Sequence, residues 1–179
     1  MAKLHTNAVA VIGLGRFGCS LAKELMATGT EVLGIDNDEQ VVQRMAAELT
    51  HAVVADATDI DALKQLGVPE FRRAVVGISE NVEASILASY HLLSFGIPDV
   101  WTKANSGLHA RVLTTLGCHH VVRPEHDTGR RVAHLIAGRL LDYIEFDDGY
   151  AIVKMRPPRE ILDRTLAEVR LRQRWGVTI

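Results

Sequence analysis

The sequence predicts an α/β protein with a doubly wound parallel β-sheet, and two observations lead to this fold class. Short runs rich in β-branched residues recur roughly every 20 to 25 positions, which is the spacing of strand–helix units. Most of these runs are apolar at successive positions, as in strands that are covered on both faces. The segments between them carry apolar residues at helical spacing. Alternating strands and helices connect through parallel crossovers, which build such a sheet.

Six strands are expected in the first part of the chain, at residues 8–12, 31–35, 52–55, 74–78, 99–102 and 120–122. Helical stripes separate them. Phe17, Leu21 and Leu25 are four residues apart, and the segment 82–93 carries a similar stripe. Together these elements form the predicted sheet domain, residues 1–123.

The pattern changes after Pro124. An amphipathic stripe predicts one helix at 127–141, and two strands are expected at 142–146 and 150–155 around an Asp-Asp-Gly turn. A Pro-Pro pair then interrupts regular structure. We therefore expect a second segment at 124–155, with a crossover helix and two strands. A third segment at 156–179 is expected to be a solvated hinge, because its basic and acidic side chains are interleaved, followed by the start of another strand.

The composition is that of an ordinary globular domain with a short appendage. Of the 179 residues, 47% are hydrophobic and 23% charged, which excludes wholesale disorder. The net charge of −2 provides no excess positive field for nucleic-acid binding. No apolar run approaches the roughly 20 residues of a membrane span, and no signal-peptide cleavage site follows the first apolar stretch. Two cysteines fit a reduced compartment, so a soluble cytoplasmic protein is expected.

A glycine-rich motif follows the first strand and opens the first helix. Its residues are Gly13, Leu14, Gly15, Arg16, Phe17 and Gly18, a G-x-G-x-x-G pattern. The first glycine permits a tight turn, the second lets the backbone approach a pyrophosphate, and the third allows close packing of helix on strand. The N-terminus of the helix adds N–H groups and a positive dipole end. In this strand–turn–helix context the motif predicts nucleotide binding by a Rossmann-like fold.

Two side chains refine this prediction. Asp36 ends the second strand, 18 residues beyond Gly18, where a carboxylate accepts hydrogen bonds from both ribose hydroxyls. It disfavours NADP, because a 2′-phosphate would meet this carboxylate with no arginine beside it. Arg16 has three alternatives: it pairs with the pyrophosphate of NAD, reaches the terminal phosphate of ADP or ATP, or points to water as an ordinary surface arginine.

Other patterns indicate enzymatic or metal chemistry less well. A cysteine–histidine group, Cys118, His119, His120 and His126, invites a zinc site. However, adjacent strand residues point to opposite faces, and no C-x-x-C or H-x-x-x-H spacing occurs. Cys19 lies in the first helical turn, where the dipole could lower its pKa, but a buried core cysteine is favoured. No Ser-His-Asp order or nucleophile elbow is present.

Five motifs, taken in order, make the family resemblance specific: residues 13–18, 35–38 (Ile-Asp-Asn-Asp), 55–58 (Ala-Asp-Ala-Thr), 101–104 (Trp-Thr-Lys-Ala) and 123–125 (Arg-Pro-Glu). They resemble the motifs of KTN domains, also called RCK N-terminal or TrkA-N domains, which are cytosolic regulators of potassium channels and transporters. The resemblance is closest to the KtrA-type subunits of Ktr potassium uptake systems and covers essentially the whole chain. Residues 170–179 resemble the start of the family's C-terminal ligand-binding lobe.

The resemblance implies further nucleotide contacts. Those on the adenosine side are Asp56, Ala57, Thr58, Ile78, Ser79 and Glu80, and this sequence departs from the family at Asn37 and Asp38, which add a carboxylate near the ribose. Within this set Asp56 and Ala57 correspond to contacts with the adenine edge, and 78–80 close over the base or ribose. Lys103, Asn105 and His109 follow the fifth strand, with Lys103 facing phosphate or a second ribose. Glu125 is expected near the terminal phosphates, in the site of a neighbouring subunit, with a divalent cation such as Mg²⁺ between them.

The function implied is that of a nucleotide-binding gating subunit of a potassium transporter or channel. ATP or ADP is the expected ligand, with NAD(H) as a further possibility and Mg²⁺ accompanying ATP. The resemblance also implies a homo-oligomer, a dimer and then a ring such as an octamer, on an integral-membrane potassium-translocating subunit. An NAD-dependent oxidoreductase is the alternative. It would need a substrate domain and a positioned acid or base, and the nucleotide lobe and its short appendix use up the chain, so we expect no enzyme.

Overall fold

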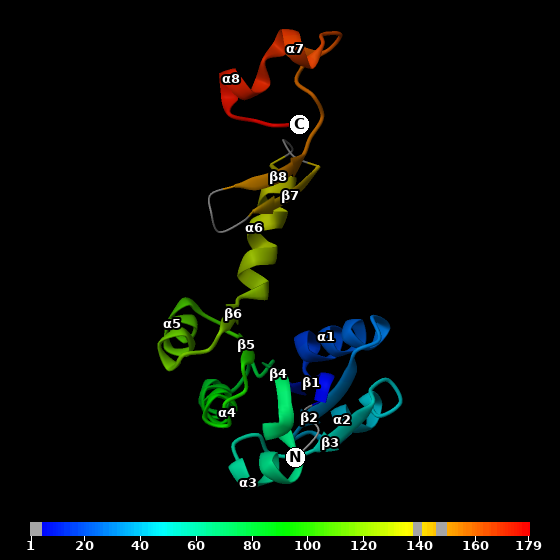
Figure 1. Cartoon of the computed structure of the whole chain (residues 1–179), viewed down its shortest axis with the longest axis vertical. Coiled ribbons are helices and arrows are strands. Elements are labelled where there is room, and N and C mark those ends of the chain that lie inside the picture. Colours follow the sequence, from blue (N-terminus) through cyan, green and yellow to red (C-terminus); the bar gives the residue numbers. More distant parts are fainter. Residues whose placement is uncertain (1–4, 138–140, 146–149) are drawn as a thin grey trace. The chain divides into compact units, whose positions relative to one another are not determined.

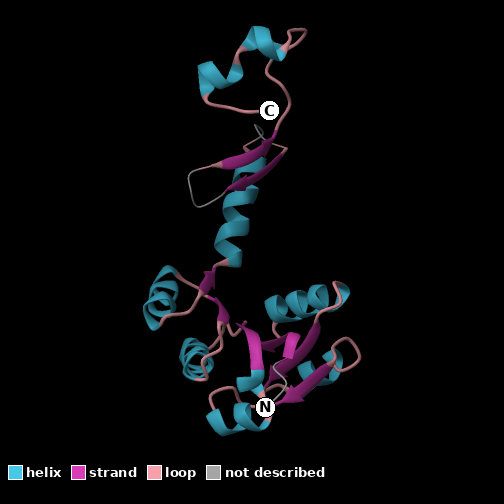
Figure 2. Cartoon of the chain, in the orientation of Figure 1, coloured by secondary structure: helices cyan, strands magenta, loops and turns pink. Residues whose placement is uncertain are grey.

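The computed structural model describes residues 5–137, 141–145 and 150–179. The chain divides into two units, Met1–Pro124 and Glu125–Ile179, and each is described by itself. Figures 1 and 2 show their helices and strands.

The first unit is built on a six-stranded sheet in which every neighbouring pair of strands is parallel. The strands are β1 (His5–Ile12), β2 (Glu31–Asp36), β3 (His51–Val54), β4 (Phe71–Val76), β5 (Asp99–Lys103) and β6 (His120–Val122). Their order is β3-β2-β1-β4-β5-β6, so the strand order reverses between β1 and β4. The predicted doubly wound, Rossmann-like fold is confirmed. Ligands of such sheets bind at this reversal, beyond the carboxyl ends of the strands.

Helices cover both faces of this sheet. They are α1 (Arg16–Ala27), α2 (Glu39–Met45), α3 (Ile60–Gln65), α4 (Val82–Ser94) and α5 (Gly107–Leu116), with a short 3₁₀ turn η1 (Val68–Glu70) before β4. Alternate residues of β1 face opposite sides. Ala8, Ala10 and Ile12 pack in a cluster with α3 and α4. Val9 and Val11 pack with α1 and α2 on the other face. Burial on both faces explains why the strand is apolar at successive positions.

Side-chain caps begin four of these helices. Asp38 Oδ1 accepts from the N–H groups of residues 40 and 41 at the start of α2, and Asp59 Oδ1 does the same for α3. Asn81 and Ser106 cap α4 and α5 in the same way. The cap residue of α1 is Gly15, which has no side chain to offer. The first N–H groups of that helix therefore lack the side-chain acceptor that the others have.

Most observed elements differ from the predicted ones only at their ends, but the start of a strand expected at the end of the chain is wrong, because α8 runs to Trp175 and described residues 176–179 form no strand. The strand expected at 74–78 is β4, which ends at Val76. The chain leaves the sheet at Gly77, whose N–H donates to Ile12 O at 2.7 Å. The helix expected at 127–141 is α6 (Pro124–Ile136), which begins earlier because proline suits the first helical turn. Residues 138–140 and the turn at 146–149 lie outside the described residues.

The second unit contains the rest of α6, an antiparallel pair of strands and a short tail. β7 (Asp142–Glu145) pairs with β8 (Ala151–Lys154), and a 3₁₀ turn η2 (Arg159–Ile161), α7 (Leu166–Val169) and α8 (Leu171–Trp175) follow. Arg131 on α6 donates to Asp142 at 2.7 Å and holds the pKa of that carboxyl below its ordinary value. In neither unit does a described helix combine the length and the apolar character that crossing a membrane requires.

The contact between α1 and the end of β1 leads to a testable prediction. A Cβ on Gly18 would collide with the carbonyl oxygen of Gly13, whereas a Cβ on Gly15 would meet no atom within 4 Å. We expect Gly18→Ala to lower the free energy of unfolding by about 2 kcal/mol or more, because helix and strand must separate. Gly15→Ala, the matched control, should cost less than about 1 kcal/mol. Urea denaturation compares them, and equal losses would contradict this account.

Candidate functional site

The glycine loop lies where the ends of β1, β2 and β4 meet. The N–H of Gly13 donates to Ile35 O at 2.8 Å, which ties the loop to β2. Gly13 has a φ of +88°, and a Cβ there would come within 2.9 Å of Ile78, in the segment that follows β4. This position therefore requires glycine for its backbone conformation and for the close approach of the next segment.

Gly15 differs from the other two glycines of the motif. Its φ is −67°, which any residue can adopt, and a Cβ on it would meet no protein atom within 4 Å. Neither conformation nor packing requires glycine here, and the residue is exposed at the N-terminus of α1. The first turn of that helix also carries no acidic side chain. The surface above Gly15 therefore suits an anionic group that must approach the backbone closely.

Asp36 holds the loop from the end of β2. Its Oδ2 accepts the N–H of Leu14 at 2.6 Å, and its Oδ1 accepts the N–H of Asp38 at 2.9 Å. Each carboxylate oxygen can accept a second hydrogen bond, so the predicted contacts to ribose hydroxyls remain compatible with this geometry. Asn37 is exposed beside it, and Asp38 serves as the cap of α2.

The loop after β3 contains the predicted adenine contacts. Asp56 Oδ1 accepts from both the N–H and the hydroxyl of Thr58, each at 2.8 Å. The hydrogen bond from the Thr58 N–H, followed by that from its hydroxyl, lowers the pKa of Asp56. The carboxylate is thus an ionised, exposed acceptor at neutral pH, while Ala57 is buried.

The segment after β4 is tied to the segment after β5. Asn105 Nδ2 donates to Ser79 O at 2.9 Å, and Asn105 Oδ1 lies 3.3 Å from His109 Nδ1. His109 is 3% exposed, and burial lowers its pKa, so the ring is neutral at pH 7. Its Nε2 is buried without a hydrogen-bond partner. Glu80 is exposed at the end of the first segment.

Lys103 joins the end of β5 to the glycine motif. Its side chain is largely buried, and Nζ lies 5.6 Å from the centre of the Phe17 ring on α1. A cation in this position adds positive charge on the side of the sheet where α1 begins. Arg16, the first residue of α1, is exposed.

The structure brings most of the predicted site residues to one sheet edge. Segments 13–18, 36–38, 56–58, 78–80 and 103–105 all lie at the carboxyl ends of parallel strands. Hydrogen bonds link 13–18 to 36–38 and 78–80 to 103–105. Glu125 belongs to the second unit, so its place relative to the glycine loop is not described.

Two residues that the sequence did not predict also contact the candidate site segments. Gly77 lies against the glycine loop, since a Cβ there would come within 2.9 Å of Gly13 O. Its position directly after a buried strand is a signal that could have identified it. His91, in the last turn of α4, contacts Thr58 O at 3.0 Å, and no sequence signal points to it.

The alternative chemistries receive no support from the described residues. Burial is the main cause that raises the pKa of Cys19, whose Sγ–H donates to Leu14 O at 2.8 Å. Cys19 is half-buried and packs against the core cluster beside α1, which does not indicate an activated thiol. His119 Nδ1 accepts the N–H of Val100, and the His120 ring stacks on Trp101. Within the described ranges, no group of three or more histidine, cysteine or acidic residues could hold a metal ion.

The double use of Asp36 leads to a prediction. Asp36→Ala removes the acceptor of two backbone N–H groups, one of them on the buried Leu14. We expect the free energy of unfolding to fall by about 2 kcal/mol, since an unsatisfied buried donor costs about this much. Thermal and urea denaturation measure the loss. Asn37→Ala, at the exposed neighbour, is the control and should be nearly neutral, whereas equal stability of both variants would show that Asp36 does not hold the loop.

Comparison with known proteins places this geometry in a family. The model of the TrkA-N domain matches residues 9–124. Ktr system potassium uptake protein C of Bacillus subtilis (strain 168) is 38% identical over 171 residues, 95% of this chain and 77% of that protein. Protein A of the same system and organism is 37% identical over 180 residues, 100% of this chain and 81% of that protein.

Solved structures show the same fold. The GsuK channel bound to NAD superposes with a TM-score of 0.71 at 17% identity, covering 96% of this chain and 32% of that chain. The GsuK structure bound to ADP gives 0.61 at 14% identity over 73% of this chain and 34% of that chain. The resemblance inferred from the five motifs is confirmed, and the chain belongs to the TrkA-N domain family.

Proposed function

We propose that this protein is a cytosolic, nucleotide-binding regulatory subunit of a potassium uptake system. The similarity to Ktr proteins A and C over nearly the whole chain supports the transport role. The nucleotide-binding role rests on one observation in the chain itself. Gly15 is a glycine that neither its backbone angles nor its neighbours require, at the uncapped N-terminus of a 12-residue helix. A phosphate group that approaches the backbone accounts for it.

The ligand we propose is an adenine nucleotide, ATP or ADP, with NAD(H) as the second candidate. The backbone around Gly15 and the N-terminus of α1 would hold its phosphates. Asp36 would accept from the ribose hydroxyls, and the ionised Asp56 from the adenine amino group. Arg16 would pair with the negatively charged phosphates. Lys103 would donate hydrogen bonds to a phosphate or to the hydroxyls of a second ribose. The names of the GsuK structures, one bound to NAD and one to ADP, are consistent with this ligand class.

Regulation requires that two ligands favour different arrangements of the assembly, because only a difference in binding free energy shifts such an equilibrium. We propose that Glu125 supplies that difference by lying near the terminal phosphates of a partner's nucleotide. Two negative groups repel there unless Mg²⁺ intervenes, so the cation should favour ATP over ADP. Glu125 is an exposed carboxylate in the first turn of α6, as this role needs.

The same proposal includes assembly into dimers and a ring on a membrane subunit. In the single chain α6 buries none of its described residues. Val132 and Ile136 on α6 are 43% and 80% exposed, and Ile144 and Ile152 on the strand pair are 50% and 63% exposed. Exposed apolar side chains in this number favour contact with another copy of the chain.

We propose a binding role and not catalysis. An oxidoreductase needs a free acid or base beside the reacting carbon. At the sheet edge, however, Asp36, Asp38 and Asp56 each accept hydrogen bonds from the backbone. The neighbouring histidine, His109, is only 3% exposed, and its Nδ1 faces Asn105 Oδ1. These contacts shape a surface, and the alternative of an NAD-dependent oxidoreductase is not favoured.

Gly15→Ala tests the nucleotide site directly. The added methyl group should obstruct the phosphates and weaken ATP, ADP and NAD⁺ binding by at least about tenfold, or 1.4 kcal/mol, with the fold retained. Isothermal titration calorimetry gives the affinities. Gly129→Ala is the matched control, since a Cβ there also meets no atom within 4 Å but lies on α6. Unchanged affinities in Gly15→Ala would refute this site.

The assembly is tested by light scattering and small-angle X-ray scattering of the chain with ATP and Mg²⁺ or with ADP. We expect an oligomer whose scattering curve differs between the two nucleotides. Ile136→Asp should shift it toward smaller species, because a charge would enter the apolar contact. A monomer at micromolar concentration, or identical curves with both nucleotides, would overturn the proposed gating mechanism.

A further inference from the structure

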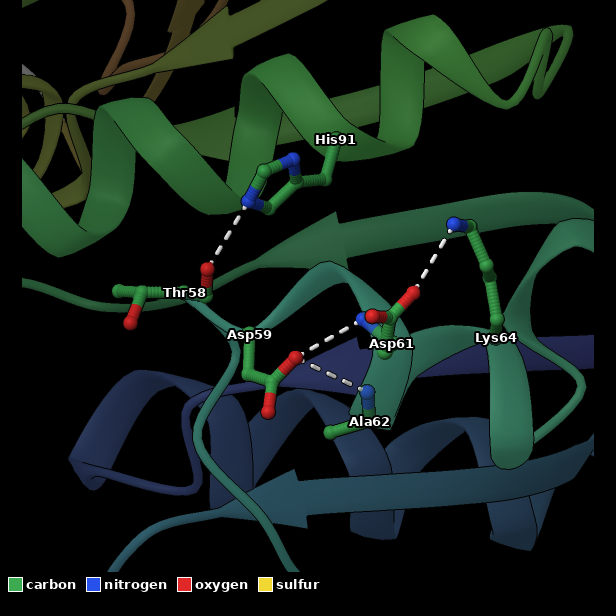
Figure 3. A network of polar contacts seen from close by, with 6 residues as sticks. All are labelled: Thr58, Asp59, Asp61, Ala62, Lys64 and His91. Atoms are coloured by element: carbon green, nitrogen blue, oxygen red, sulfur yellow. Dashed lines mark hydrogen bonds and ion pairs between the residues drawn. The ribbon is translucent and has the colours of Figure 1, made fainter.

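A histidine in the last turn of α4 reaches the loop that follows β3. His91 Nε2 lies 3.0 Å from the carbonyl oxygen of Thr58, which is 33 residues away in the sequence. Figure 3 shows the ring directed from α4 toward this carbonyl. Because a carbonyl oxygen only accepts hydrogen bonds, Nε2 carries the hydrogen and donates.

The other hydrogen bonds drawn in this network are local. Asp59 Oδ1 accepts from residues 61 and 62 at the start of α3, and Lys64 pairs with Asp61 on the same helix. Asp56 is likewise bonded to Thr58 within the loop. These contacts give the loop its shape but do not locate it against the rest of the unit. The bond from His91 does, since it joins the loop to a different helix.

The same helix begins directly after the other predicted base contacts. Asn81 caps α4, its Oδ1 accepting the N–H of Ala84 at 3.0 Å, and residues 78–80 come immediately before it. Leu92, the residue after His91, and Ala88, three residues before it, belong to one buried cluster with Ala57 of the loop. The helix is therefore continuous with the segment at 78–80 and packs against the loop at 56–58, the two segments that are expected to enclose the adenine.

The hydrogen-bonding groups of His91 argue against a role in packing alone. Its Nδ1 is buried without a hydrogen-bond partner. Burying an unpartnered polar atom costs free energy that a leucine of similar volume would avoid. What the imidazole contributes in return is the hydrogen bond from Nε2 to Thr58.

We propose that His91 is a positioning residue for adenine binding: by holding Thr58, it sets the distance between the loop at 56–58 and the segment at 78–80. This inference rests on the proposed nucleotide-binding function. His91 does not touch the ligand itself. Loss of the His91 side chain weakens the binding of all adenine ligands alike, because the base is common to them. The loss of affinity does not depend on the number of phosphates.

Two variants of the full chain test the proposal. His91→Leu keeps an apolar body and removes the donor, whereas His91→Gln places an amide N–H at nearly the same reach as Nε2. In the ligand-free protein, hydrogen exchange should accelerate at residues 56–59 in His91→Leu and stay near the wild-type rate in His91→Gln. In calorimetry, AMP, ADP and ATP should each bind roughly five- to tenfold more weakly to His91→Leu, with recovery in His91→Gln.

The outcomes separate this inference from the proposed function. His51→Leu, at an exposed histidine at the opposite end of β3, is the control and should change neither measurement. Wild-type nucleotide binding with unchanged exchange and affinity in His91→Leu would overturn the role of His91 and leave the function standing. A wild-type chain that binds none of the three nucleotides would overturn both. Losses that grow with the number of phosphates would also contradict a role at the base.

Discussion

The close approach of α1 to the end of β1 is the constraint on which the candidate site depends. Gly18 packs so tightly against the backbone of Gly13 that no side chain fits between them. This contact directs the N-terminus of α1 toward the point where the strand order reverses. The N–H groups and dipole of the helix then face the region where a doubly wound sheet binds its ligand. The other segments are arranged around this fixed helix end.

Polar side chains at the sheet edge hold backbone segments in place in the ligand-free chain. Asp36 joins the second strand to the glycine loop, and Asn105 joins the segment after β5 to Ser79. Such contacts preorganise a binding surface, because loops that are already held lose less conformational entropy on binding. They also mean that a substitution here changes stability and affinity together. Glycine variants separate the two effects, since Gly15 and Gly18 differ in their neighbours and not in chemistry.

The two units suit different parts of the proposed function. The first has a core buried on both faces of its sheet and presents the candidate nucleotide site. The second unit buries little of its apolar surface within one chain. Among its described residues, Val169 is the apolar side chain that is almost fully buried. In the proposed function, a nucleotide bound to the first unit would alter the contacts that the second unit makes with another copy of the chain.

The sequence by itself determined the fold class, the strand positions and the glycine motif, because these depend on local patterns. A strand buried on both faces must be apolar at successive positions, and a phosphate-binding turn must have glycine at fixed spacing. For the same reason the family could be recognised from five short motifs, and most candidate site residues could be placed at the ends of strands.

Only the tertiary structure decided what each side chain contacts. Asp38 turns out to cap α2, His109 is buried beside Asn105, and His91 reaches Thr58 across 33 residues. No periodicity records such long-range hydrogen bonds, since they depend on how helices lie against loops that are distant in the chain. The difference between Gly15, with open space above it, and Gly18, pressed against backbone, is likewise spatial. Both are the same residue in the same motif, and only their neighbours in three dimensions distinguish the proposed phosphate contact of Gly15 from the packing of Gly18.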